Sequence, residues 1–256
     1  MNDEGSIMGR LRIIGALVLL MLPLVCRADI AVHVTRLIHQ GDERMVVERI
    51  WNKGDKPSLI QAWIDEGDRE QSVSGTRPPF FATPPLFQLE PGRNRDISVR
   101  LVDAASLPSD RESLYWLNIL DLPATAKSDG STDIAYAVRW RIKLFHRPTG
   151  LSGSSADAVS GLKWAVRRSG DRIVLVAQND APYHVSLREL QLGGHALELP
   201  VASAAIAPLA EWAMEIPAPK GPDGMRLKGV WLDDEAEGHD FELIAACDEE
   251  WCGQIQ

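Results

Sequence analysis

Four basic side chains recur along one short stretch of this sequence. Residues 133–148, DIAYAVRWRIKLFHRP, alternate with the period of two that is typical of a β-strand. One face of that strand would carry apolar side chains: Ile134, Tyr136, Val138, Trp140, Ile142 and Leu144. The opposite face would carry cations: Arg139, Arg141, Lys143 and Arg147. A strand that is apolar on one face and cationic on the other raises the question of what these cations do in a chain that is acidic overall.

The composition of the whole chain limits what such a row could bind. The chain has 256 residues and a formal net charge of −9, with 45% hydrophobic residues. A net acidic protein is a poor match for the phosphates of nucleic acid, so nucleic acid is excluded as a partner. The length and composition are those of a globular protein with one large or two small domains, and we favour two.

The first residues have the pattern of a cleaved export signal. Arg10 and Arg12 precede an apolar run over 13–25, and small Ala28 ends a cleavage pattern. We therefore predict a signal peptide over 1–28, export, and no membrane span in the mature chain. A retained membrane anchor is disfavoured because Pro23 interrupts a run that is already short for a bilayer.

Two cysteines would remain after cleavage, Cys247 and Cys252, within CDEEWC near the C-terminus. In an oxidising compartment the expected state of such a pair is a disulfide. Half of a zinc site is the competing interpretation, but no His stands at ligand spacing from these cysteines. We expect a disulfide and no metal.

Short strand patterns fill the mature chain and predict an all-β protein. About seven strands fall before a stretch rich in Ser, Gly and Ala over 147–161, and six more follow it. This spacing favours two-sheet sandwiches over alternating β and α elements. We place the domains at 29–151 and 152–256, the first ending in the cationic strand.

Sequence motifs of enzymes are absent from the chain. It has no Gly-rich phosphate loop, no G-x-S-x-G and no H-E-x-x-H. We therefore predict a protein that is not an enzyme and needs no cofactor. The alternative from the residues alone is a secreted adhesive or carbohydrate-binding module, which could use some of the eight Trp on an exposed sheet face.

A longer signature carries a family resemblance. Residues 107–124, LPSDRESLYWLNILDLPA, resemble closely the signature of the periplasmic chaperones of the chaperone-usher pathway. KPSLIQAWID, TPPLFQLEPG and RIKLFHRP resemble other blocks of that family in their usual order, and the closing cysteine pair resembles its C-terminal disulfide. QNDAPYHVSLRELQLGG is similar to a second-domain segment, with Asp180 and Ala181 where Pro and Thr are usual.

This resemblance implies a fold and a function. The fold would be two immunoglobulin-like β-sandwiches at an angle with a cleft between them. The protein would be a periplasmic chaperone that binds, folds and caps pilus or fimbrial subunits and delivers them to an outer-membrane usher. It would lend the subunit a strand, with Ile134, Tyr136 and Val138 as the donated side chains. Whether the free chaperone caps this strand by self-association stays open.

The resemblance also implies roles for two groups of charged residues. Arg36 and Lys143 would anchor the C-terminal carboxylate of the subunit, whereas each residue taken alone would be expected on the solvated surface. Arg139 and Arg141 are expected to be solvated surface charges. Arg147 would join the domains through ion pairs with Glu112 and with an acid of the second domain, for which Asp233 and Asp234 are both candidates.

Overall fold

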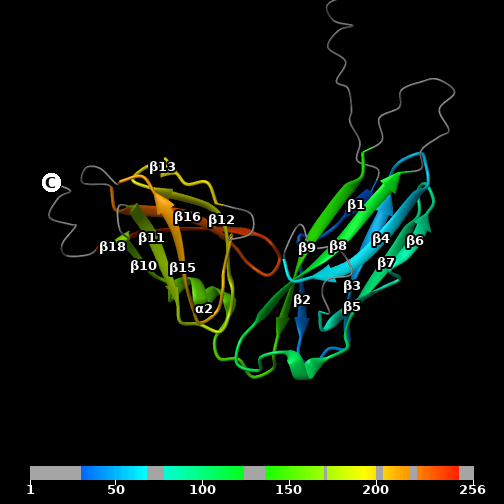
Figure 1. Cartoon of the computed structure of the whole chain (residues 1–256), viewed down its shortest axis with the longest axis horizontal. Helices are drawn as coiled ribbons and strands as arrows, with labels where there is room; N and C mark the ends of the chain where they lie inside the picture. The colour runs from blue at the N-terminus through cyan, green and yellow to red at the C-terminus, as the bar shows by residue number, and fades with distance from the viewer. Residues whose placement is uncertain are drawn as a thin grey trace, which may run out of the picture.

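The chain folds into two β-sandwiches that meet at an angle, as the computed structural model shows (Figure 1). The structure describes residues 30–67, 78–123, 136–169, 172–199, 204–218 and 224–247. The predicted signal peptide over 1–28, Ile134 and Cys252 lie outside the described residues. The predicted all-β fold with two immunoglobulin-like sandwiches is confirmed.

The first sandwich packs a four-stranded sheet against a five-stranded sheet. The four-stranded sheet has the order β1 (Ile30–Val32), β3 (Met45–Asn52), β7 (Asn94–Leu101) and β5 (Phe80–Thr83). The five-stranded sheet has the order β2 (Arg36–Gln40), β9 (Val138–Arg147), β8 (Ser113–Pro123), β4 (Ser58–Asp65) and β6 (Leu86–Leu89). A 3-10 turn, η1 (Ala104–Ser106), precedes β8.

Alternating side chains from the two sheets fill the first core. Ile50 of β3 and Ile97 of β7 are fully buried, and they share one hydrophobic cluster with Ile60, Leu117 and Leu144 of the other sheet. Because successive residues of a strand point to opposite faces, burying Ile142 and Leu144 turns Arg141 and Lys143 away from the core. The core therefore sets which face of β9 carries the cations.

The start of the chain contributes one short strand to each sheet of the first sandwich. Its first strand, β1, pairs with β3. Its second, β2, runs parallel to β9, with Arg36 opposite Lys143 and Gln40 opposite Arg147. Thus β2 covers only the C-terminal half of the β9 edge.

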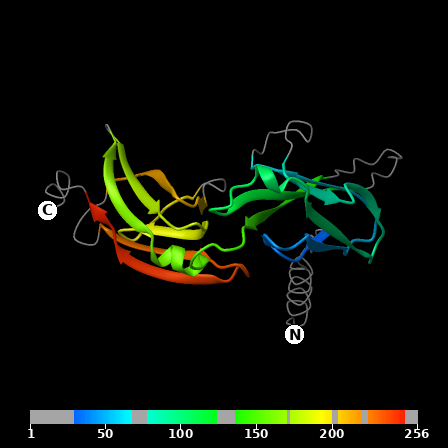
Figure 2. The same cartoon turned by 90° about the horizontal axis from the view of Figure 1, so that it is seen from below.

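The second sandwich also has two sheets (Figures 1 and 2). One has the order β15 (Ala210–Ile216), β11 (Arg172–Asn179), β10 (Lys163–Ser169) and β18 (Ala246–Cys247). The other has the order β13 (His195–Ala196), β12 (Val185–Leu192), β16 (Arg226–Leu232) and β17 (Gly238–Ile244), with β14 (Ala205–Ile206) paired to β12.

A helix, α2 (Ser155–Ser160), lies in the stretch from which the sequence predicted only a linker. The Ser154 hydroxyl caps it by accepting a hydrogen bond from the backbone N–H of Asp157 at 3.2 Å. Ala158 is buried in the core of the second sandwich, while Leu151 and Val159 pack against that core. The connection between the domains is therefore partly folded onto the second domain.

Candidate functional site

The N-terminal half of β9 has one unpaired edge. On its other edge β9 pairs with β8 along its length, from Val138 opposite Asp121 to His146 opposite Ser113. Since β2 pairs only with residues 143–147, no described strand covers the second edge over residues 138–142. Such an edge presents free backbone N–H and C=O groups to another chain.

The side chains that precede and begin this edge are exposed and apolar. Tyr136 is 73% exposed and Val138 is 39% exposed. Further along the same face, Ile142 and Leu144 are buried in the core. The strand therefore leaves its own core as it runs back toward Tyr136, so these two side chains can pack against another molecule.

Arg36 and Lys143 lie opposite each other on adjacent strands at the point where pairing with β2 begins. Arg36 is only 7% exposed, and its Nε is buried without a hydrogen-bond partner. Lys143 is half-buried, with its Nζ 5.8 Å from the centre of the Trp116 ring. Neither side chain forms an ion pair with a carboxylate among the described residues.

The pKa of Lys143 reflects its burial beside another cation. Burial, and after it the neighbouring charge of Arg36, lowers the pKa of Lys143 to about 8. Burial also lowers the pKa of Arg36, an effect that Asp234 and Asp233 oppose. Arg36 is buried with an unpaired Nε, and the adjacent Lys143 is half-buried. This pair of cations favours binding of an anion, because a carboxylate would supply the missing hydrogen bond and charge.

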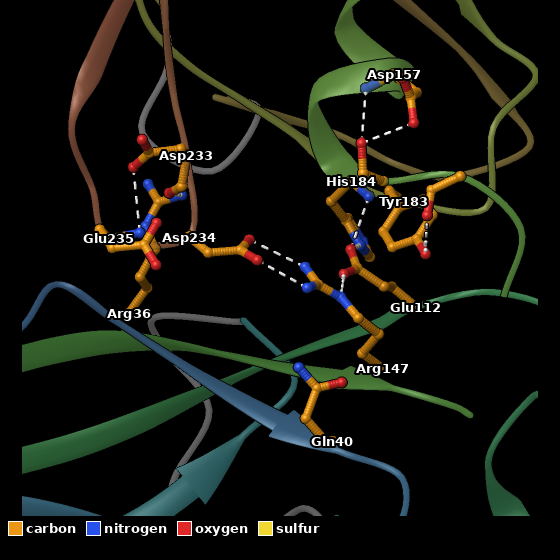
Figure 3. Close-up of polar contacts among 12 residues, drawn as sticks. Arg36, Gln40, Glu112, Arg147, Asp157, Tyr183, His184, Asp233, Asp234 and Glu235 are labelled. Atoms are coloured by element: carbon orange, nitrogen blue, oxygen red, sulfur yellow. Dashed lines mark hydrogen bonds and ion pairs between the residues drawn. The ribbon is translucent and has the colours of Figure 1, made fainter. Parts of the chain in front are cut away.

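Arg147 links the two domains at the base of this site (Figure 3). Its Nε donates to Glu112 Oε1 at 2.7 Å, while Nη1 and Nη2 donate to the two carboxylate oxygens of Asp234 at 2.7 and 2.9 Å. Glu112 also accepts from the backbone N–H of His184 at 2.8 Å. Burial alone would lower the pKa of Arg147, but the bonds and charges of Asp234 and Glu112 raise it.

Asp233, the other acid considered as a partner of Arg147, is engaged elsewhere. Its carboxylate lies 2.6 Å from Nε2 of His239. Of these two adjacent acids, Asp234 therefore faces Arg147 and Asp233 faces its own hairpin. A small pocket at this junction is lined by both domains, including Arg36, Phe145 and Asp234.

The expectation that Arg139 and Arg141 are solvated charges is wrong. Both pair with Asp65 at the end of β4, each through Nη2 at 2.9 Å, and Asp65 is only 2% exposed. The Arg139 guanidinium also lies 4.9 Å from the Trp63 ring. The buried Asp65 carboxylate offsets the cost of removing two guanidinium groups from water. The two arginines are therefore held in place on the outer face of β9.

Two polar features of the first domain carried no signal in the strand patterns. Asn118 of β8 donates to Asp65 Oδ2 at 2.8 Å and accepts from Arg139 Nε at 2.9 Å. His39 and His146 face each other in the core across the β2–β9 pair, with their Nδ1 atoms 3.1 Å apart. The sequence did not predict either contact, because an alternating apolar pattern does not indicate which buried polar residues will find partners on other strands.

The described residues contain no group of three or more His, Cys, Asp or Glu that could hold a metal ion. Within the same residues, no helix combines the length and the apolar character required to cross a membrane. The proposed pairing of Cys247 with Cys252 falls outside the described residues and stays a prediction.

The fold and the site together define a class of protein. Family models match both domains: "Pili and flagellar-assembly chaperone, PapD N-terminal domain" over residues 29–152 and "Pili assembly chaperone PapD, C-terminal domain" over residues 157–235. The chain therefore belongs to the pilus-assembly chaperone family. This is a family of periplasmic chaperones rather than of enzymes.

Individual relatives agree with this assignment. The chain is 34% identical over 224 residues to the chaperone protein FimB/FhaD of Bordetella pertussis, covering 85% of each chain. It is 34% identical over 192 residues to the probable fimbrial chaperone YadV of Escherichia coli, covering 74% of this chain and 78% of that one.

Solved structures of similar proteins share the fold. The crystal structure of the YadV chaperone matches with a TM-score of 0.68 and 31% identity, covering 85% of this chain and 100% of that chain. The Salmonella enterica SafB chaperone, solved in complex with the SafA pilin, matches with a TM-score of 0.70 and 22% identity, covering 85% and 97%.

Proposed function

We propose that this protein binds, folds and caps pilus subunits by donor-strand complementation in the periplasm and delivers them to an outer-membrane usher. The observation that carries this proposal is the unpaired edge of β9 over residues 138–142 beside buried Arg36 and half-buried Lys143, neither of which forms an ion pair among the described residues. A subunit that lacks its final strand has an open hydrophobic groove, and a donated strand closes it through backbone hydrogen bonds and alternate side chains.

The apolar side chains at the start of the strand fill the groove in this mechanism. Tyr136 and Val138 are exposed, as a plug must be before the client arrives, and Ile134 would precede them at the same spacing. Their exposure costs little in the free protein but makes the edge prone to association, so a second copy could also cover it.

Arg36 and Lys143 bind the C-terminal carboxylate of the subunit. A carboxylate loses hydration when it enters the junction, and two charged donors offset that cost. Because the anchor lies at the end of the free edge, it also sets the register of the client strand. A slip of one residue would turn the client's apolar side chains to the wrong face.

The junction network keeps the two domains in position around the client. Glu112 of the first domain and Asp234 of the second meet at Arg147, which follows the anchor on β9. We place the domain boundary at 151–152 and the disulfide between Cys247 and Cys252, both as parts of this proposal, together with export through a signal cleaved after residue 28.

Client capture in the periplasm tests the proposal. A tagged protein should retain pilin-like subunits, identified by mass spectrometry, at a stoichiometric ratio. Lys143→Ala should lose them with an unchanged thermal midpoint. Arg36→Ala should lose them while the protein stays folded, with a lower midpoint because two interdomain hydrogen bonds are removed. Arg49→Ala is the matched control, because Arg49 is an exposed cation that pairs with Asp96 on the other sheet. Full retention by Lys143→Ala, or retention of glycans in place of subunits, would overturn the proposal.

A further inference from the structure

A hairpin of the second domain reaches Arg36 on the first. Arg36 Nη1 donates to the backbone carbonyl of Leu232 at 3.1 Å and to that of Asp233 at 2.6 Å, at the end of β16. Figure 3 shows Arg36 extending toward Asp233 and Glu235 in the turn between β16 and β17. These contacts cross the domain junction and involve the backbone, so no residue type in the sequence indicates them.

These two bonds determine which edge of the guanidinium is available. Both carbonyls accept from Nη1, so this nitrogen is engaged by the hairpin. The guanidinium edge formed by Nε and Nη2 remains for another acceptor, and its Nε is buried without a hydrogen-bond partner. A carboxylate pairs best with two parallel N–H groups of one guanidinium edge, so the hairpin presents Arg36 in an orientation suited to a carboxylate.

The side chain of Asp233 holds the turn that supplies these carbonyls. Its Oδ1 accepts from the backbone N–H groups of Glu235 at 3.1 Å and Glu237 at 2.8 Å. Its Oδ2 lies 2.6 Å from Nε2 of His239, and the His239 ring stacks on Trp231 with 4.8 Å between centres. The hydrogen bond from His239 lowers the pKa of Asp233, so the carboxylate stays charged at neutral pH.

We propose that the β16–β17 hairpin is the second-domain part of the client-carboxylate site and that Asp233 is its positioning residue. Asp233 acts through Arg36 and needs no contact with the client. This inference rests on the proposed function, because it names the part of the anchor that the second domain contributes. It assigns to the second domain an effect on client affinity that is exerted through Arg36, in addition to holding the domains together.

Acetate is a simple probe of this site, and NMR can follow it. In the 15N–1H spectrum, the buried Arg36 Nε–H should give a protected signal that shifts as acetate is added. Asp233→Ala should weaken acetate binding by about tenfold, the loss expected for one charge-assisted hydrogen bond. Asp233→Asn retains an oxygen for the backbone N–H groups of the turn and should keep most of the affinity.

Glu242→Ala is the matched control. Glu242 lies on the same hairpin and pairs with Arg226 and Lys228 on the surface, with 44% of its side chain exposed. Its loss should change neither the acetate affinity nor the exchange rate of the Arg36 Nε–H. If Asp233→Ala acted only by loosening the hairpin, Glu242→Ala should weaken acetate binding as well. The proposed positioning role predicts that Glu242→Ala leaves acetate binding unchanged.

The outcomes separate this inference from the function on which it rests. If the parent protein does not bind acetate at Arg36, the carboxylate anchor itself is wrong and this inference fails with it. If the parent binds and folded Asp233→Ala binds equally well, only the positioning role is wrong. If Asp233→Ala unfolds, His239→Ala decides: a loss of about two- to threefold supports the proposal, and unchanged affinity overturns it.

Discussion

Raising the pH should weaken client binding through Lys143. Burial and the Arg36 charge lower the pKa of Lys143 to about 8 in the free protein. A bound carboxylate favours the charged ammonium group and raises this pKa, so binding is coupled to proton uptake above pH 8. Between pH 7 and pH 9 the protonated fraction of the free site falls about tenfold, and the affinity for acetate should fall by about the same factor.

The variant Lys143→Arg separates this effect from a general effect of pH. A guanidinium stays protonated throughout this range, so its affinity for acetate should be flat between pH 7 and pH 9. Isothermal titration calorimetry in buffers of different ionisation enthalpy would measure both the affinity and the proton uptake. An equal loss of affinity in parent and Lys143→Arg, or no loss in the parent, would refute the reasoning.

Three further changes test other parts of the structure. Burial lowers the pKa values of His39 and His146 in the folded protein. As the pH falls below about 6.5, the unfolded chain therefore binds more protons than the folded protein, and the free energy of unfolding decreases. Replacing both histidines with Phe should remove this acid-dependent loss of stability. Each histidine contributes up to about 1.4 kcal/mol per pH unit, which urea unfolding between pH 7 and pH 5 would measure. Asp65→Ala should cost about 3 kcal/mol in the same assay at pH 7, because it leaves two covered guanidinium groups without a carboxylate; a loss under 1 kcal/mol would contradict the buried pairing. Arg147→Ala should also cost about 3 kcal/mol or more, because Glu112 stays buried without its cation, and a neutral result would show that water replaces the arginine.

The strand pattern predicted most of the first domain because its physical basis is local. Burying every second side chain of β9 fixes both faces of the strand, and this follows from Ile142 and Leu144 alone. The strand pattern could not predict that Arg36 lies beside Lys143, since 107 positions separate them. In the sequence analysis only the family resemblance placed the two residues together. Their parallel register then follows from the paired strands.

The errors concern partners that come from other strands. Arg139 and Arg141 were expected in solvent because charged side chains on the outer face of a strand are usually exposed. Their carboxylate, Asp65, stands at the end of β4, two strands away across β8. The cap at Ser154 was readable from its residue type, but a six-residue helix has too short an apolar pattern to be distinguished from a linker.

The most direct measurement is a structure of this protein with the subunit it retains from the periplasm. The account predicts a subunit strand hydrogen-bonded to the β9 edge over residues 138–142, with its terminal carboxylate on the Nε–Nη2 edge of Arg36 and on Lys143. Tyr136 and Val138 should lie in the subunit's groove. A subunit bound to another surface, with this edge left free, would contradict the account.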